Sequence, residues 1–291
     1  MASGAPVPRQ ERMGSVEARL WGAVGSGAWT VDDAGWRADD AGLDLLIGLD
    51  EAGRGPLAGP VSVAAVALRP DRFTAAGRPA WFDTIDDSKK LTERRRESLY
   101  ASVIADAAAF AIVHVHADHV DAVNILQATL HGMAVAVELL LGLDGTSWPG
   151  RPAVEVVRHA AGLPVAWYGD RIAAGGVPVG ADALACPMTA PMARLLVDGN
   201  ASVSVVGSVA RGLPQESIVK GDALSVHIAA ASILAKVSRD RVMTLADAQW
   251  PGYGLAGHKG YPTRSHKAAL VELGPCPIHR RTFAGVVLDR T

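Results

Sequence analysis

Residues 45–68 read LLIGLDEAGRGPLAGPVSVAAVAL, and this stretch decides the fold. The apolar runs at 45–50 and 61–68 are typical of buried strands. The segment GRGPLAGP between them is rich in Gly and Pro, as a turn is. The sequence therefore predicts two strands paired as a hairpin, with Asp50 and Glu51 where the first strand ends.

The regions after this hairpin alternate between helical and strand patterns. Thr92 is a plausible N-cap for a helix over 92–107. Residues 110–116 alternate weakly, as a strand does, and residues 118–142 have the apolar spacing of one long amphipathic helix. Strands with intervening helices predict an α/β domain.

The later part of the chain continues the same alternation. The run ARLLVD predicts a strand that ends in Asp198, and residues 217–220 predict a short strand. A helix is expected over 222–246. A last helix over 263–273 is capped by Thr263 and stopped by Gly274 and Pro275.

Two segments depart from this pattern. Residues 1–43 are rich in Gly, Ala and Asp, and we interpret them as a partly ordered extension with a short helix at 15–23. Residues 144–190 are rich in Gly, Pro and Ala and are interpreted as an insertion or an irregular subdomain. We expect residues 44–291 to form one domain, with the 144–190 segment as an insertion within it.

Composition excludes several protein classes. Of the 291 residues, 49% are hydrophobic, so the chain can bury a sizeable core and is not disordered. No apolar run approaches the roughly 18–20 residues of a membrane span, and the first residues lack a signal-peptide core. The two cysteines, Cys186 and Cys276, lack metal-ligand spacing. We therefore expect a cytoplasmic protein without membrane association.

The net charge of −2 argues against nucleic-acid binding, but the charges are unevenly distributed. Residues 1–44 have a net charge of −3, with four Arg against seven Asp or Glu. Residues 251–291 contain six Lys or Arg and two Asp or Glu, a net charge of +4. The acidic N-terminal region hides the basic C-terminal region in the net charge, so the net charge does not exclude a nucleic-acid substrate.

The adjacent carboxylates Asp50 and Glu51 are candidates for a metal site. Burying two carboxylates beside a core strand costs free energy unless a cation or hydrogen-bond donors compensate. Oxygen ligands suit Mg²⁺ or Mn²⁺, and the alternative is a solvated turn. A dinucleotide-binding loop is disfavoured, because a strand and not a helix follows the glycines.

Two further carboxylates lie at the ends of predicted elements, Asp198 after a strand and Asp222 at a helix start. Each alone is more often a turn or cap residue. Together with Asp50 and Glu51 they supply four carboxylates from separate segments, which is what a two-metal phosphodiester hydrolase needs.

Basic, hydroxyl and aromatic groups occur in two polar segments. DSKKL contains Ser88, Lys89 and Lys90, and HKGYPT contains His258, Lys259 and Tyr261. The lysines could contact phosphates, and Tyr261 could stack on a sugar or base. The alternatives are an exposed turn for the first segment and a loop with a packed tyrosine for the second.

Seven motifs, in this order, resemble ribonuclease HII, the type 2 ribonuclease H. They are DEAGRGPLAGPV, DSKKLTERRRESLY, NILQATLHGM, LLVDGN, KGDALSVHIAAASILAKVSRDR, YGLAGHKGYPT and HRRTF. The resemblance covers roughly 45–143 and 192–287. It implies a ribonuclease H-like α/β fold, with a central mixed sheet flanked by helices and a helical C-terminal portion.

The resemblance also implies the activity. It implies metal-dependent endonucleolytic cleavage, with Mg²⁺ or Mn²⁺, of RNA in RNA–DNA hybrids and of single ribonucleotides in duplex DNA. Cutting on the 5′ side of the ribonucleotide would leave 3′-hydroxyl and 5′-phosphate ends. A monomer that acts in DNA replication and repair is expected from the same resemblance.

The family's functional residues carry over by motif. Asp50, Glu51, Asp198 and Asp222 match its metal-binding carboxylates. Gly53, Arg54 and Gly55 match the loop that reads the ribose 2′-hydroxyl, largely through backbone groups, and Tyr261 matches the tyrosine at the junction with the next deoxynucleotide. Contacts with substrate phosphates would involve Lys89, Lys90 and Lys236.

The long head and the 144–190 segment depart from the family pattern, but neither removes a carboxylate. Two other functions compete with the junction-cutting nuclease. A binding protein for RNA–DNA hybrids that has lost catalysis is disfavoured because all four carboxylates are present. A phosphodiesterase acting only on long hybrids is disfavoured because the Gly-Arg-Gly loop and Tyr261 are intact.

Overall fold

A computed structural model describes residues 13–21, 29–32, 35–38, 45–73, 76–141, 154–158, 179–184 and 193–286. Its centre is a seven-stranded sheet in the order β6-β7-β5-β4-β3-β8-β9. The strands are β3 (Leu45–Ala52), β4 (Val61–Leu68), β5 (Ala107–Val115), β6 (Val154–Arg158), β7 (Val179–Leu184), β8 (Ala193–Asp198) and β9 (Gln215–Ile218).

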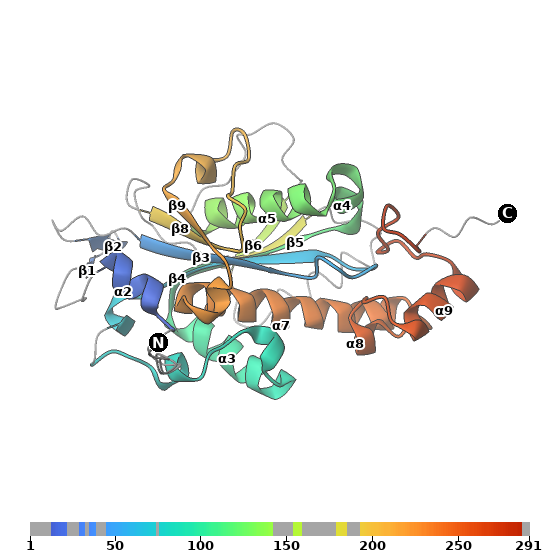
Figure 1. Cartoon of the computed structure of the whole chain (residues 1–291), viewed down its shortest axis with the longest axis horizontal. Helices are drawn as coiled ribbons and strands as arrows, with labels where there is room; N and C mark the ends of the chain where they lie inside the picture. Colours follow the sequence, from blue (N-terminus) through green and yellow to red (C-terminus); the bar gives the residue numbers. More distant parts are fainter. Residues whose placement is uncertain are drawn as a thin grey trace, which may run out of the picture.

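The predicted hairpin is confirmed, because β3 and β4 pair antiparallel and place Asp50 opposite Ala64. On its other side β3 pairs parallel with β8. The sheet is therefore mixed, as the resemblance implied. All eight residues of β4 are buried, since helices cover both faces of the sheet (Figure 1).

One face of the sheet packs on α5 (Ile125–Leu140), and α4 (Ala117–Val123) precedes it. The other face packs on α7 (Val226–Gln249), with α3 (Glu93–Asp106) alongside (Figure 1). The strand β4 illustrates the alternation. Val63 and Ala65 contribute to the core on the α5 side, whereas Ala64 and Val66 contribute to the core on the α7 side.

The C-terminal portion is helical, as the resemblance implied. The helices α8 (Leu255–His258) and α9 (Arg264–Leu273) pack on the end of α7 around a separate apolar cluster. Thr263 caps α9 as predicted, because its hydroxyl accepts a hydrogen bond from the backbone N–H of His266. The short 3₁₀ helices are η1 (Pro70–Phe73), η2 (Ala80–Asp83), η3 (Ser88–Lys90), η5 (Val209–Gly212) and η6 (Gly221–Ala223).

The single helix expected over 118–142 is wrong. Asn124 has a φ of 74° and separates α4 from α5, which are bent by 118° to one another. Its side-chain oxygen accepts a 3.1 Å hydrogen bond from the N–H of Gln127 and so caps α5. Asn tolerates the left-handed region and is a strong N-cap, so a periodic apolar pattern hides this break.

Two other boundaries also differ from those expected. The helix expected from 222 begins at Val226, with Ser225 as its N-cap, so that Asp222 lies in η6 instead. The strand expected over 217–220 lies at Gln215–Ile218, and Lys220 has a φ of 59°. A residue in the left-handed region ends an extended strand.

In the extension, α2 (Ser15–Trp21) falls within the predicted 15–23 helix. The buried Glu17 carboxylate accepts a 2.6 Å hydrogen bond from Ser225 Oγ and another from the N–H of His227, which anchors α2 on the start of α7. The strands β1 (Trp29–Asp32) and β2 (Gly35–Ala38) form an antiparallel pair.

The 144–190 segment supplies β6 and β7, which extend the sheet beyond β5. The Gly, Pro and Ala content did not predict these two strands, and the rest of the segment lies outside the described residues. In the part of the chain that the structure describes, no single helix meets the length and apolarity of a membrane span. The bent pair of α4 and α5 meets them only when counted together.

Candidate active site and nucleic-acid cleft

Asp50 and Glu51 lie where β3 leaves the buried part of the sheet. Asp50 is 6% exposed, and the backbone N–H of Glu51 donates a 2.7 Å hydrogen bond to its Oδ1. Burial, followed by the charges of Glu51 and Asp198, raises the pKa of Asp50 well above its usual value. The pKa of Glu51 is raised as well, by burial, although the Arg54 guanidinium lowers it in part.

Asp198 and Asp222 complete the acidic group. The strand β8 runs parallel to β3 with Val197 opposite Leu49, so Asp50 and Asp198 end neighbouring strands at the same edge. Asp222 follows in η6. Burial, then the charges of Asp198 and Asp87, raises the pKa of Asp222 to about 6. The sequence prediction that the four carboxylates lie together is consistent with these mutual effects.

A divalent cation suits this group of side chains. The donors are all carboxylate oxygens, which Mg²⁺ and Mn²⁺ prefer. Their repulsion is relieved when a cation binds between them. Among the described residues, no three His, Cys, Asp or Glu side chains are placed so that together they could hold a metal ion. The four carboxylates therefore stay a prediction as the protein ligands of such an ion.

A cleft of about 580 Å³ lies beside Glu51. It brings together segments that are far apart in the sequence: the end of β3, the glycine loop, η3, α3, α7 and the loop before α9. Its lining comprises Glu51, Ala52, Gly53, Arg54, Gly55, Ser88, Lys89, Arg96, Ser232, Lys236 and Tyr261. Seven of the predicted substrate-binding residues are among them.

The glycine loop is tightly packed at Gly53 and open at Gly55. Gly53 has a φ of 93°, and a Cβ there would lie 1.9 Å from Arg239 Nε. A Cβ on Gly55 would meet only Tyr261 Cε1, at 3.9 Å. The exposed Arg54 places its Nη1 3.4 Å from Glu51 Oε1. The loop therefore connects the acidic group to the cleft.

Cationic side chains also line the cleft. Burial lowers the pKa of Lys89, but the charges of Asp87, Asp50, Asp222 and Asp198 outweigh it and raise that pKa overall. Lys89 also lowers the pKa of Glu51 in part, so it interacts electrostatically with all four predicted metal ligands.

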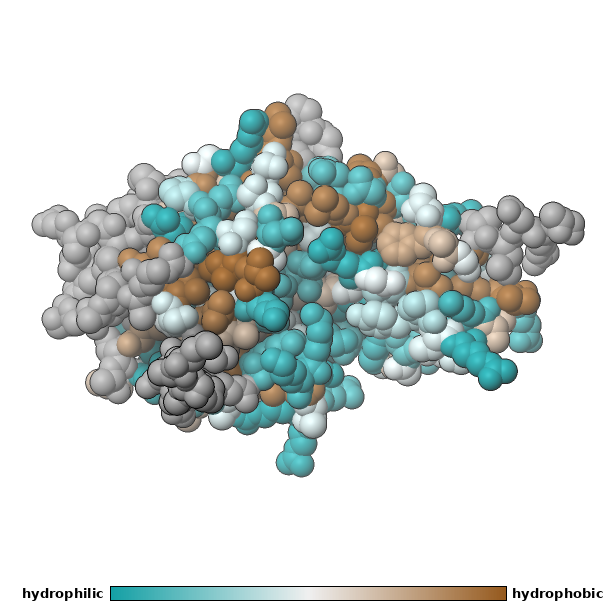
Figure 2. All heavy atoms as spheres, in the orientation of Figure 1, coloured by the Kyte–Doolittle hydropathy of each residue, from teal (hydrophilic) through white to brown (hydrophobic). Residues whose placement is uncertain are grey.

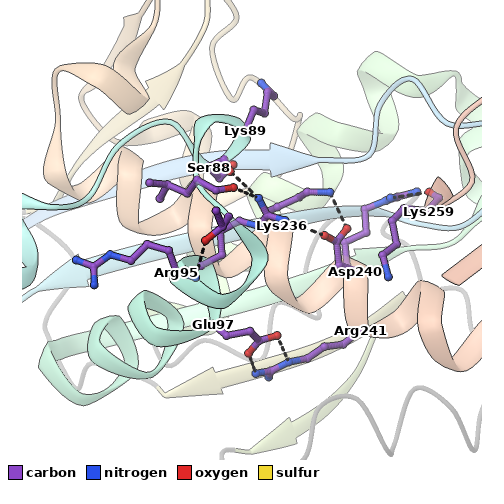
Figure 3. A network of polar contacts seen from close by, with 12 residues as sticks. Ser88, Lys89, Arg95, Glu97, Lys236, Asp240, Arg241 and Lys259 are labelled. Carbon is purple, nitrogen blue, oxygen red and sulfur yellow. Dashed lines mark hydrogen bonds and ion pairs between the residues drawn. The ribbon is translucent and has the colours of Figure 1, made fainter. Parts of the chain in front are cut away.

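On α7, Lys236 Nζ lies 2.7 Å from Asp240 Oδ1 (Figure 3). From α3, Arg96 Nη2 lies 3.9 Å from Asp240 Oδ2. Arg241 pairs with Glu97 across α7 and α3 (Figure 3). Hydrophilic side chains gather over α3 and continue toward the centre of the face in Figure 2.

Three predicted binding residues do not line this cleft. Lys90 forms an ion pair with Asp86, with 3.6 Å between Nζ and Oδ1. Lys259 donates from Nζ to Thr244 Oγ1 at 3.0 Å. The ring nitrogens of His258 are engaged by the backbone, since Nε2 lies 2.8 Å from the Tyr253 carbonyl oxygen and Nδ1 accepts from the N–H of Gly260.

Sequence reasoning missed several residues of the site. Arg96 and Ser232 line the cleft, and Asp240 holds the cations there. The buried arginines Arg239 and Arg280 donate to backbone carbonyls of the glycine loop and its flanks. Their signal was present in the KVSRDR and HRRTF motifs, but basic residues in a helix or tail are usually exposed.

Comparison with known proteins identifies the family. The Ribonuclease HII family matches residues 47–143 and 191–286. The chain is 41% identical over 247 residues to ribonuclease HII of Geobacter metallireducens, which covers 84% of this chain and 86% of that protein. It is also 41% identical to ribonuclease HII of Xanthomonas oryzae, which covers 84% of this chain and 73% of that protein.

Solved structures share the fold. The ribonuclease H2 of Pyrococcus horikoshii superposes with a TM-score of 0.54 and 21% identity, and covers 83% of this chain and 94% of that one. A Bst ribonuclease HIII in complex with Mn²⁺ has a TM-score of 0.50 and 13% identity, and covers 84% of this chain and 68% of that one. With the family match over both motif regions, this chain belongs to the ribonuclease HII family and is an endoribonuclease of the ribonuclease H type.

Proposed function

We propose that this chain hydrolyses the phosphodiester on the 5′ side of ribonucleotides, both in RNA–DNA hybrids and singly within duplex DNA. One observation carries the proposal. The loop at 53–55 and Tyr261 line a single cleft with Glu51 and three cations, Lys89, Arg96 and Lys236. The loop that would recognise the ribose, the tyrosine that would stack on a sugar or base and the cations that would bind phosphate therefore lie beside Glu51.

The 2′-hydroxyl is the only feature that separates a ribonucleotide from a deoxynucleotide in this position, and it both donates and accepts hydrogen bonds. Glycines let backbone groups approach it closely. Tyr261 is 42% exposed and is free to stack on a sugar or base. The cations Lys89 and Lys236 would bind phosphates and hold the strand in register without reading its sequence.

Divalent ions, Mg²⁺ or Mn²⁺, would be held by Asp50, Glu51, Asp198 and Asp222, and would supply an activated water and stabilise the leaving oxygen. The Mn²⁺ in the structure of Bst ribonuclease HIII supports this choice of metal. Lys89 would screen the carboxylates before substrate binds. Arg54, beside Glu51, would orient that carboxylate toward the scissile phosphate.

The test is a DNA duplex that carries one ribonucleotide, incubated with Mg²⁺, Mn²⁺ or chelator. A long RNA–DNA hybrid and an all-DNA duplex of the same sequence are the comparison substrates. We expect a metal-dependent nick on the 5′ side of the ribonucleotide with 3′-hydroxyl and 5′-phosphate ends. Cleavage of the hybrid alone would reject the junction-reading roles of Tyr261 and the glycine loop. Cleavage of neither would favour a hybrid-binding protein.

We also propose that the chain acts as a monomer in the cytoplasm, in replication and repair of DNA. The monomer and the role in replication and repair rest on the sequence resemblance, and the cytoplasmic location rests on the composition. Sedimentation of the full chain with and without the duplex tests the monomer, and a dimer at micromolar concentration would contradict it.

A further inference from the structure

Arg280 connects the C-terminal segment to the glycine loop. Its side chain is fully buried, and its guanidinium donates to four carbonyl oxygens of the glycine loop and the residues that follow it, up to Gly59. Nη2 donates to Gly53 at 2.6 Å and Nη1 to Arg54 at 2.8 Å. Nη1 also donates to Pro56 at 2.8 Å, and Nε donates to Gly59 at 3.1 Å. One side chain thus contacts four carbonyl groups between residues 53 and 59.

Only an arginine can make this set of contacts. A guanidinium presents five N–H donors in a planar, rigid fork and keeps its charge at any pH at which the protein folds. A lysine ammonium is a point charge with three donors on a flexible stem, so it cannot reach four carbonyls arranged around a plane. The loop conformation is therefore matched to the shape of this side chain.

The direction of these carbonyls fixes the direction of the loop's amides. In a trans peptide the C=O of one residue and the N–H of the next point to opposite sides. The carbonyls of Gly53 and Arg54 face Arg280, so the N–H groups of Arg54 and Gly55 face away from it. Arg54 and Gly55 line the cleft that also holds Tyr261.

The peptide between Pro56 and Leu57 shows the same two-sided arrangement. The carbonyl of Pro56 faces Arg280, while the N–H of Leu57, on the other side of that peptide, donates a 2.8 Å hydrogen bond to the carbonyl of Gly260. Gly260 directly precedes Tyr261. The loop therefore lies between Arg280 on one side and the tyrosine segment on the other.

We propose that Arg280 is a positioning residue for ribose recognition. Its guanidinium holds the peptide planes of residues 53–56 so that the N–H groups of Arg54 and Gly55 face the cleft beside Tyr261 and donate to the 2′-hydroxyl. This inference rests on the proposed function, and it adds a residue more than 220 positions away from the loop. Arg280 itself does not touch the substrate.

The test compares Arg280→Lys with Arg281→Lys, a matched change at the exposed neighbouring arginine. The first readout is a binding ratio: the affinity for the duplex with one ribonucleotide divided by that for the all-DNA duplex, with chelator present. We expect Arg280→Lys to bring the ratio to near one without changing the all-DNA affinity, and Arg281→Lys to leave it unchanged. A purely structural role would lower the active fraction for both duplexes equally.

The second readout is hydrogen exchange, which needs no substrate. In Arg280→Lys the amides of residues 50–58 should exchange faster, whereas those of β8 should keep their rate. A folded Arg280→Lys with an unchanged ratio and unchanged exchange would overturn the proposal. Failure of the proposed function is distinct, because the wild-type ratio would then already be one.

A measurement on the unmodified chain covers the case in which Arg280→Lys does not fold. The amides of Arg54 and Gly55 should exchange more slowly when the ribonucleotide duplex is added than when the all-DNA duplex is added. Equal protection by the two duplexes would overturn the outward direction of these amides, and with it the role of Arg280.

Discussion

The backbone N–H of Gly221 donates a 2.7 Å hydrogen bond to the Asp198 carboxylate. This contact ties the end of β8 to η6, in which Asp222 is the next residue. This backbone donor therefore helps to hold the two carboxylates relative to one another. A side chain at position 221 would disturb both, because a Cβ there would lie 3.2 Å from Asp198 Oδ1 and 2.5 Å from Ile228 Cδ1.

We predict that Gly221→Ala lowers metal-dependent cleavage by about tenfold or more and shifts the metal titration to higher concentration. The displaced Asp198 would bind the ion less well, and ligand geometry is demanding for Mg²⁺. Gly212→Ala is the matched control, since a Cβ there meets nothing within 4 Å. Equal titration midpoints in the two variants would show that the Gly221 contact does not position the ligand.

Asp50→Asn should abolish cleavage and yet stabilise the metal-free protein. Burial, Glu51 and Asp198 raise the pKa of Asp50, so its ionised form destabilises the fold as pH rises. An amide removes that charge. At pH 8 with chelator we expect a melting temperature higher by about 2 °C or more, which corresponds to roughly 1 kcal/mol in a chain of this size.

The outcome with metal should be the opposite. Mg²⁺ or Mn²⁺ should raise the melting temperature of the wild type, since a ligand that binds only the folded state stabilises it. The metal should shift Asp50→Asn by less. Undiminished turnover in Asp50→Asn would remove this residue from the metal site.

The sequence predicted the hairpin, the strand that ends in Asp198 and the cap at Thr263, because each has a local cause. A buried strand needs a continuous apolar run, and a helix start needs a side-chain oxygen. The break at Asn124 has a local cause too, but the apolar period continues through it. The β6 and β7 strands pair at the sheet edge through backbone hydrogen bonds, which a Gly- and Ala-rich composition does not signal.

The acidic residues of the candidate site were predictable because carboxylates beside a buried strand need a cation or hydrogen-bond donors to compensate for burial. Lysines and histidines were less predictable, because their role depends on which neighbour they meet. Lys236 faces Asp240 one helical turn later, which a sequence can suggest. His258 instead forms hydrogen bonds with the backbone of residues 253 and 260. Arg280 forms hydrogen bonds with the glycine loop, more than 220 residues earlier in the sequence. Such contacts follow only from the tertiary fold.

Alanine substitutions should have different effects at Gly53, which is tightly packed, and at Gly55, which has open space around it. Gly53→Ala places a Cβ 1.9 Å from Arg239 Nε on a backbone with φ of 93°, so we expect a lower melting temperature and loss of cleavage. Gly55→Ala meets Tyr261 Cε1 at 3.9 Å only. Its free energy of unfolding should stay within about 0.5 kcal/mol of the wild type. Similar melting curves for the two variants would contradict the difference between the tightly packed Gly53 and the open Gly55.

Tyr261→Ala should affect cleavage and leave stability almost unchanged. The ring is 42% exposed, and the backbone of this segment is held independently by hydrogen bonds with the His258 carbonyl and the His266 ring. Stacking on a base contributes about 1–3 kcal/mol, so cleavage at a single ribonucleotide should fall about tenfold or more. Val271→Ala, at an exposed position of α9, is the control. Unchanged single-ribonucleotide rates would remove Tyr261 from the site.

A chain of neutral histidines supports the same segment. His266 Nδ1 lies 2.9 Å from the Tyr261 carbonyl and therefore donates to it, which leaves its Nε2 as an acceptor. His279 Nε2 lies 3.0 Å from that acceptor and donates to it, and His279 Nδ1 then accepts from the N–H of Cys276. A second proton on either ring would place two N–H groups against one another.

The free energy of unfolding should therefore decrease as these histidines are protonated. Burial, then the His266 charge, lowers the pKa of His279 to about 4, and burial lowers that of His266, which stacks on His258. An unfolded histidine titrates near 6.5. Between about 6.5 and 4 the unfolded chain binds more protons than the folded one, so the free energy of unfolding falls as pH falls. Urea denaturation at pH 7 and pH 5 measures this difference. His279→Asn should reduce this difference in the free energy of unfolding. A variant that keeps the full difference would show that the titrating groups lie elsewhere. Buried His114 is one such group, because burial lowers its pKa to about 3.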